Sequence, residues 1–291
     1  MSTTEGKTVS TTNRTIDLIA DIGEGFGSYR MGDDDALLDS LTSANVACGF
    51  HAGDPRTIER AVASCVEKGV SIGAHPGFPD LVGFGRREVS SSYDEVRTDV
   101  LYQIGALHAF VEAAGASLSH VTPHGRLGNL VVTDRTYAEA VAAAVEAFDP
   151  TLILVAQSGE LEHVARERGL IFARLGLVDR AYEDDGTLVS RREEGAVLHD
   201  PEEIAERTIS MVVDGTVRSR NGKLVEVECD TVLLHGDNPG SIRAAALVRS
   251  SLEAAGVVIA PLRAADALEP VGVQPGSAGT VGVPTVQLTG P

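Results

Sequence analysis

Polar side chains that can carry protons or bind metal ions recur directly after short apolar segments of this 291-residue chain. Asp21 and Glu24 follow the first such segment, and His51 and Asp54 follow the second. The later apolar segments are followed by His75, His124, His235 and Asp237. Imidazole and carboxylate groups exchange protons near neutral pH and bind divalent cations. Because four of the eight histidines share this placement, we predict a catalytic or metal-binding cluster.

The apolar segments themselves indicate the fold. Seven of them alternate with longer amphipathic stretches, a pattern typical of βα units on a parallel sheet. The expected strands cover residues 16–20, 43–48, 70–74, 118–122, 152–156, 170–174 and 231–234. The expected helices include residues 55–68, 93–114, 137–148, 201–213 and 241–255. In a parallel barrel the carboxyl ends of the strands meet at one end, which is where active sites are built.

The chain is expected to fold as one barrel domain over residues 15–262. Residues 1–14 are rich in Ser and Thr and residues 263–291 in Gly and Pro, without helical or alternating periodicity, so both are predicted to be tails. Within residues 182–229 an Asp-Asp-Gly and an Asn-Gly sequence favour turns. A small hairpin insert is therefore expected there.

The composition argues against several classes of protein. Lys and Arg number 24 against 42 Asp and Glu, so the net charge of -18 repels nucleic acid and anionic membranes. No apolar run reaches the ~18 residues of a membrane span, and the first residues do not resemble an export signal, so we expect a cytoplasmic protein. Cys48, Cys65 and Cys229 form no close pair and are expected in the core rather than in disulfides or a zinc site.

Two arginine pairs, Arg86-Arg87 and Arg191-Arg192, interrupt this acidic background. Guanidinium groups bind phosphate and carboxylate well, but a salt bridge to the following Glu88 or Glu193 would explain each pair equally. The chain contains no recognised nucleotide-binding loop, no serine nucleophile elbow and no His-Glu-x-x-His zinc helix.

The segments that carry these residues resemble the LamB/YcsF family. The resemblance runs in order over residues 16–258 and includes Asp-Ile-Gly-Glu-Gly-Phe-Gly at 21–27 and His-Gly-Asp at 235–237. The other matching segments are 43–55, 73–87, 102–107 and 179–182. Motifs of this length are highly specific.

The resemblance implies a seven-stranded parallel β/α barrel, similar to the glycoside hydrolase/deacetylase group. It also implies opening of the cyclic amide 5-oxo-L-proline to L-glutamate with ATP as co-substrate, together with B and C partner subunits. A five-membered lactam is a poor electrophile. Phosphorylation of its amide oxygen would create a leaving group and allow water to attack the ring carbon, so the ATP requirement is chemically reasonable.

The resemblance also suggests roles for individual residues. Asp21 and Glu24 would be general bases or metal ligands, and Arg86 or Arg87 would hold a carboxylate or phosphate. The histidines expected to carry protons or bind metal are His51, His75 and His124, and His235 and Asp237 would close the site. Further substrate or phosphate contacts are expected from Asn45, Arg126 and Asn129. The resemblance does not decide whether a divalent metal ion is bound; its candidate ligands are Asp21, His51, His75 and His124.

The chain departs from the family pattern beside the expected site. Ile19 stands where the family has an amide, and Thr122 and Gly128 stand where it has a lysine and a tyrosine. Arg126 replaces an alanine and could fill the space of the lost lysine. These changes leave open a different cyclic or linear amide as substrate, metal-dependent hydrolysis, or a non-catalytic role in binding partners.

Overall fold

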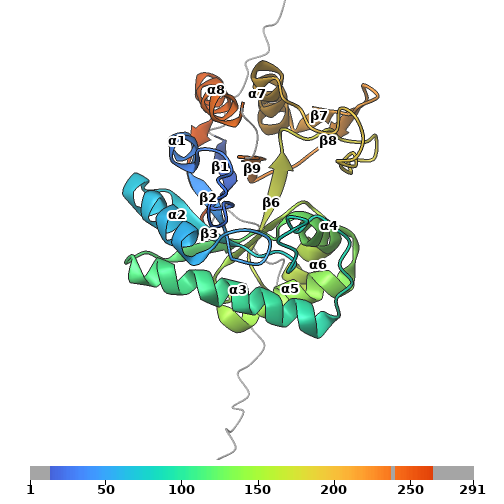
Figure 1. The fold of residues 1–291 in the computed structure, drawn as a ribbon. Coiled ribbons are helices and arrows are strands. Elements are labelled where there is room, and N and C mark those ends of the chain that lie inside the picture. The colour runs from blue at the N-terminus through green and yellow to red at the C-terminus, as the bar shows by residue number, and fades with distance from the viewer. Residues whose placement is uncertain (1–13, 237–239, 265–291) are drawn as a thin grey trace, which may run out of the picture.

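The computed structural model describes residues 14–236 and 240–264, and their strands form a closed parallel barrel (Figure 1). The strands of the wall are β1 (Thr15–Ile22), β2 (Ser43–Ala47), β3 (Ser71–His75), β4 (Leu118–Val121), β5 (Ile153–Ala156), β6 (Phe172–Leu177) and β9 (Thr231–Leu234). They are hydrogen-bonded in this order, and β9 returns to β1 to close the barrel. The predicted seven-stranded β/α barrel is confirmed.

Helices surround the wall (Figure 1). They are α1 (Asp34–Leu38), α2 (Pro55–Lys68), α3 (Tyr93–Ala113), α4 (Gly125–Thr133), α5 (Arg135–Phe148), α6 (Glu160–Arg168), α7 (Pro201–Ile209) and α8 (Ser241–Ala254). A π-helical turn, Ser210–Asp214, continues α7. The sequence analysis did not single out α1, α4 and α6, which are short, and α4 contains two glycines. Among the described residues, no helix has the length and apolar character needed to span a membrane.

Two further pairings extend this plan. The short strands β7 (Thr216–Arg218) and β8 (Leu224–Glu226) pair antiparallel as a hairpin beside the barrel. Strand β10 (Val258–Ile259) pairs with the start of β1.

Strand β1 extends two residues beyond the expected end, so Asp21 lies within it rather than after it.

Alternate residues of each strand face the barrel interior. Leu18, Ala20 and Ile22 belong to the large core between wall and helices, whereas Ile19 belongs to a separate core inside the barrel. The other members of that inner core are Ile153, Val155, Ala173, Leu175, Leu177 and Leu233. They come from β5, β6 and β9. The part of the barrel interior that is enclosed by β1 to β4 is therefore available to polar side chains.

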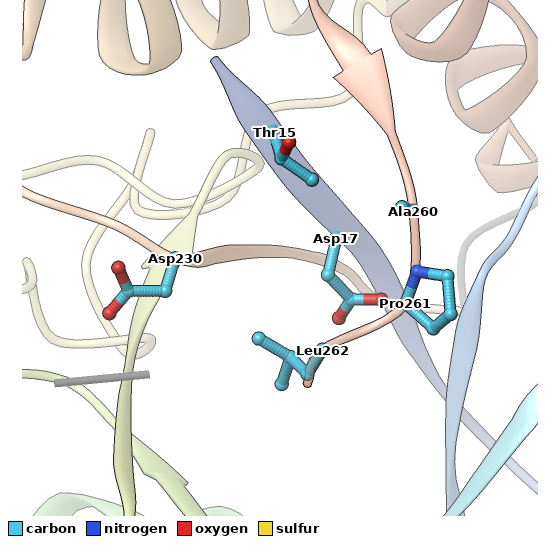
Figure 2. Close-up of a pocket in the computed structure, with 6 residues that line it drawn as sticks. All are labelled: Thr15, Asp17, Asp230, Ala260, Pro261 and Leu262. Carbon is cyan, nitrogen blue, oxygen red and sulfur yellow. The ribbon is translucent and has the colours of Figure 1, made fainter. Parts of the chain in front are cut away.

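Asp17 closes the amino-terminal end of the barrel. Its carboxylate accepts hydrogen bonds from the hydroxyl groups of Thr42, Ser43 and Thr231 at 2.8, 2.6 and 2.6 Å. Burial raises the pKa of Asp17 above its usual value although these donors oppose the rise. Figure 2 shows the small recess beside it, which is also lined by Thr15, Asp230, Ala260, Pro261 and Leu262. At this end of a barrel, polar networks serve stability.

Asp54 caps a helix rather than joining the polar cluster. Its side chain accepts hydrogen bonds from the backbone N–H groups of Arg56 and Gly27 at 3.0 and 2.9 Å and from the Thr57 hydroxyl at 2.7 Å. It thereby satisfies the start of α2 and ties the loop after β1 to it.

We expect Asp54→Ala to lower the free energy of unfolding by about 1–2 kcal/mol, because N-cap loss leaves helix N–H groups without a protein acceptor. Urea unfolding would measure the change, and Asp54→Ser should recover most of it. Equal stability of wild type and Asp54→Ala would contradict the assigned role.

Candidate active site

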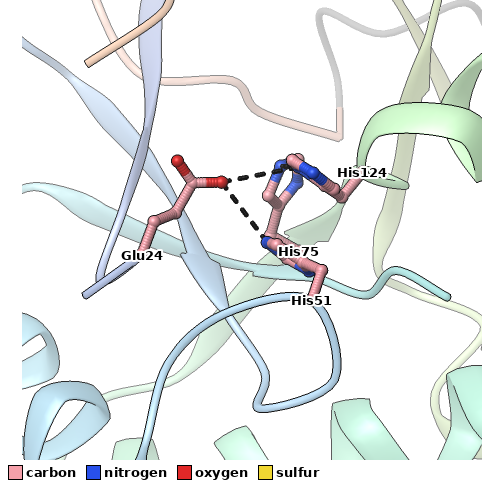
Figure 3. A group of neighbouring side chains, drawn as sticks. All are labelled: Glu24, His51, His75 and His124. Atoms are coloured by element: carbon pink, nitrogen blue, oxygen red, sulfur yellow. Dashed lines mark hydrogen bonds and ion pairs between the residues drawn. The ribbon is translucent and has the colours of Figure 1, made fainter. Parts of the chain in front are cut away.

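Four side chains from four adjacent strands meet at the carboxyl end of the barrel. Glu24 follows β1, His51 follows β2, His75 ends β3, and His124 follows β4 as the N-cap residue of α4. All four are buried, and one ligand atom from each lies within 4.8 Å of the others. Figure 3 shows the carboxylate of Glu24 pointing at the imidazoles. We refer to these four residues as the Glu–His cluster.

Glu24 contacts two rings of the cluster through one oxygen. Its Oε1 lies 3.3 Å from His51 Nε2 and 3.4 Å from His124 Nδ1 (Figure 3). The His51 and His124 rings are stacked, with centroids 3.7 Å apart and planes 3° from parallel. The His75 ring stands at 85° to His124.

Backbone carbonyl groups determine which nitrogens of two rings carry hydrogen. His75 Nδ1 lies 2.6 Å from the carbonyl oxygen of Thr122, and His124 Nε2 lies 2.8 Å from that of Phe84. A carbonyl can only accept, so both nitrogens donate. In the neutral rings, His75 Nε2 and His124 Nδ1 are then unprotonated, yet they lie 2.9 Å apart. Two facing lone pairs at this distance require a cation between or beside them, either a proton or a metal ion. The cluster therefore fits a metal ion.

Asp21 lies beside the cluster as a second carboxylate. Its Oδ1 is 3.3 Å from His75 Nε2 and accepts a hydrogen bond from Asn45 Nδ2 at 2.9 Å. Burial alone would raise the pKa of Asp21, but His75, His235 and His124 favour its charged form and hold the pKa below its usual value.

The rings of His51 and His124 are held in their neutral form. Burial is the largest cause that lowers the pKa of each, and neighbouring histidines and Arg86 add to it. His51 Nδ1 is buried and has no hydrogen-bond partner among the described residues. A neutral imidazole carries a lone pair that can bind a metal ion.

A chain of hydrogen bonds inside the barrel fixes Asp21. Since Asn45 donates to Asp21 through Nδ2, its Oδ1 accepts from His120 Nε2 at 2.9 Å. His120 Nδ1 then accepts from the Ser119 hydroxyl at 2.7 Å. Burial lowers the pKa of His120 to about 3, so the ring is neutral. The sequence analysis missed His120, although a histidine at an inward position of an expected strand was the available signal.

The loop after β3 covers the cluster. Phe84, whose carbonyl binds His124, has a φ of 55°, an uncommon conformation for a residue with a side chain. Asp80 accepts a hydrogen bond from the Gly83 N–H at 3.0 Å and pairs with Arg87. At Gly85 an added Cβ would lie 2.8 Å from His51 Cβ and 2.9 Å from His124 Cδ2, so only glycine allows this close approach.

The predicted anion-binding residues divide into two groups. Arg86 stands over the Phe84 ring at 4.8 Å and contributes to the low pKa values of the cluster. Arg87 is instead bound to Asp80, and Arg126 is bound to Glu88 at 3.0 Å. Asn129 is exposed on α4. The structure thus brings Arg86 and Asn45 to the site.

His235 forms a second polar group at the same end of the barrel. Its Nδ1 donates to Asp179, 2.8 Å away, and its Nε2 accepts from Arg191. Burial alone would raise the pKa of Asp179, but His235 and Arg191 stabilise its charge and hold the pKa below its usual value. The sequence analysis placed Asp179 in a family segment but did not name it as a site residue. Asp237 lies outside the described residues.

Ile19 and Thr122, two of the departures from the family pattern, are both buried. Ile19 packs in the apolar inner core. Thr122 is buried and supplies the carbonyl group that binds His75, but its hydroxyl has no hydrogen-bond partner among the described residues.

The model of the LamB/YcsF family matches residues 16–267. The chain belongs to this family. It is 49% identical over 248 residues to the 5-oxoprolinase A subunit of Pyrococcus furiosus, covering 85% of this chain and 97% of the relative. The corresponding protein of Mycolicibacterium gilvum is 51% identical over 246 residues, covering 84% and 98%. The crystal structure of the lactam utilization protein from Thermus thermophilus superposes with a TM-score of 0.81 at 46% identity, covering 85% and 100%.

The contact between Gly73 and His120 makes a testable prediction. A Cβ at residue 73 would lie 2.0 Å from His120 Nε2. We expect Gly73→Ala to displace the ring and lower the free energy of unfolding by about 1–3 kcal/mol. The matched control is Gly105→Ala in α3, where nothing lies within 4 Å of an added Cβ. Chemical unfolding of both variants would check this, and equal stabilities would refute the packing argument.

The neutral state of His120 predicts a pH dependence of stability. Its folded pKa of about 3 lies below its unfolded value of about 6.5, so the unfolded state binds more protons between these values. Its contribution is fully present above pH 6.5 and is lost as the pH falls toward 3. We expect a shallower loss of stability in His120→Gln than in wild type when urea unfolding is compared at pH 7.5 and pH 5. Parallel losses would exclude His120 as the titrating group.

Proposed function

We propose that this chain is the A subunit of an ATP-dependent 5-oxoprolinase, which opens 5-oxo-L-proline to L-glutamate together with B and C partner subunits. The observation that carries the proposal is the buried Glu–His cluster beside Asp21. It lies in a chain about half identical, over most of its length, to proteins named as 5-oxoprolinase A subunits.

The reaction needs both activation of the amide and activation of water. Transfer of the terminal phosphoryl group of ATP to the amide oxygen makes that oxygen a leaving group. Water then adds to the ring carbon, and the ring C–N bond breaks as nitrogen gains a proton. A second water hydrolyses the resulting acyl phosphate to the carboxylate and inorganic phosphate. The protein must remove a proton from water and supply one to nitrogen, which is general acid–base catalysis.

The cluster offers a base in a suitable environment. We assign the proton from water to His51, because its ring is hydrogen-bonded to Glu24 at 3.3 Å and the charge of Asp21 opposes the fall in its pKa that burial causes. A neighbouring carboxylate stabilises the imidazolium that forms, as in other histidine–carboxylate pairs. Asp21 would orient His75 through the 3.3 Å contact with its Nε2.

The positively charged groups near the site suit the two anions of the reaction. Arg86 lies over Phe84 beside the cluster, and Arg191 is held at the Asp179–His235 pair. We assign Arg86 to the carboxylate or phosphate of the substrate. The nucleotide would bind to one of the partners or at a shared interface, and the complex would work in the cytoplasm.

A second candidate is metal-dependent hydrolysis of another cyclic or linear amide. The facing lone pairs of His75 and His124 favour it, and so does the loss of the family lysine at Thr122.

We expect Glu24→Gln to lower turnover of the reconstituted complex by at least about 100-fold, the usual scale of acid–base assistance. The assay is glutamate release from 5-oxoproline by this chain mixed with B and C subunits of the same genome, with and without ATP. His163→Gln, an exposed position on α6, serves as the control and should retain full activity. Full activity of Glu24→Gln would remove the cluster from the chemistry, and ATP-independent hydrolysis of another amide would favour the second candidate.

A further inference from the structure

We propose that Glu24, His75 and His124 together bind one divalent transition-metal ion of the Zn²⁺ type, with these three of the described residues as its ligands. The inference deepens the proposed function, on which it rests for the role of the ion but not for its binding.

The direction of the lone pairs carries the proposal. Hydrogen bonds to the carbonyl groups of Thr122 and Phe84 leave His75 Nε2 and His124 Nδ1 as acceptors that face each other at 2.9 Å. Glu24 Oε1 lies 3.4 Å from the same His124 nitrogen. Three electron-pair donors of the types that Zn²⁺ prefers therefore lie within 4.8 Å of one another.

The spacing of these atoms also fits an ion. Ligands at about 2.0–2.1 Å in a tetrahedron lie about 3.3–3.4 Å from one another. The His75–His124 and His124–Glu24 distances of 2.9 and 3.4 Å are close to this spacing, and all the ligand atoms lie within 4.8 Å of one another. The perpendicular rings of His75 and His124, at 85°, let both in-plane lone pairs point at a common centre.

The orientation of His51 excludes it from the same ligand set. Its ring lies parallel to that of His124, 3.7 Å away, so the in-plane lone pairs of the two rings run side by side and do not converge. His51 is instead hydrogen-bonded to the ligand Glu24 through its Nε2. Three protein ligands with an open position distinguish catalytic from structural zinc sites.

The surroundings of the ligands support the assignment. Histidines that bind metals almost always donate their other ring nitrogen to a carbonyl or carboxylate group, and both rings do so here. Asp21 adds a negative charge 3.3 Å from His75 Nε2. An ion bound here would polarise a carbonyl oxygen and lower the pKa of water beside His51.

The test measures binding directly. The purified full chain is stripped with a chelator, loaded with Zn²⁺, passed through gel filtration and analysed for metal content. We expect one retained Zn²⁺ per chain. We also expect loading with Co²⁺ to give the visible absorption of a low-coordinate site with nitrogen ligands, a readout that needs no variant.

Variants separate this site from binding elsewhere. His75→Gln, His124→Gln and Glu24→Gln should weaken Zn²⁺ binding by more than about 100-fold in calorimetry, whereas His51→Gln should retain it. The surface control His163→Gln should bind like wild type. Circular dichroism verifies folding, and the Co²⁺ spectrum of wild type decides the question if a ligand variant unfolds.

Three results would overturn the proposal. These are no retained ion in folded wild type, unchanged binding in a folded ligand variant, and equal losses in His51→Gln and His124→Gln. The proposed function can fail independently of the ion site. If the chain binds zinc but its complex releases no glutamate, the ion site stands and the proposed function is wrong. If the zinc-free complex shows full ATP-dependent glutamate release, the ion has no role in the reaction.

Discussion

Two hydrogen bonds from imidazole rings to backbone carbonyl groups determine what the rest of the site can do. The carbonyl of Thr122 fixes His75, and the carbonyl of Phe84 fixes His124. Because each carbonyl accepts a hydrogen bond from its ring, the two remaining nitrogens face each other and are unprotonated when both rings are neutral. In the proposed ion site these two atoms are ligands, and Glu24 and Asp21 supply negative charge around them.

These two carbonyl groups are held by very different parts of the fold. The Thr122 backbone is hydrogen-bonded to Ala74 at the end of neighbouring strands, so the barrel wall itself sets its position. Phe84 lies in a loop with a positive φ, a conformation that costs of order 1–3 kcal/mol and persists only where surrounding contacts enforce it. Here Asp80 with Gly83 and Arg87 enforces it. The barrel strands thus fix the orientation of His75, and the loop conformation at Phe84 fixes that of His124.

The division of the barrel interior explains why the polar groups can be buried at all. Apolar side chains of β5, β6 and β9, together with Ile19, fill one half of the interior. The other half contains a connected chain in which Asp21, Asn45 and His120 satisfy one another. A buried polar chain is stabilising only when it is complete, and Gly73 is what leaves room for its central ring.

The sequence allowed the fold and the location of the site to be predicted, because apolar periodicity specifies the strands and carboxyl-terminal strand ends must converge. Glu24, His51, His75 and His124 could be named for that reason. Their mutual orientation, and the partners of Arg87 and Arg126, depend on loop conformations that no periodicity encodes. Asp179 was not named as a site residue because its contact is with His235, which is 56 residues away in the chain.

The most direct test of this account is the protonation state of the two locked rings, measured by ¹⁵N NMR of histidine-labelled, zinc-loaded protein with resonances assigned by substitution. The account predicts opposite tautomers, with hydrogen on Nδ1 of His75 and on Nε2 of His124, and no hydrogen on the two facing nitrogens. Hydrogen on either His75 Nε2 or His124 Nδ1 in that protein would contradict it.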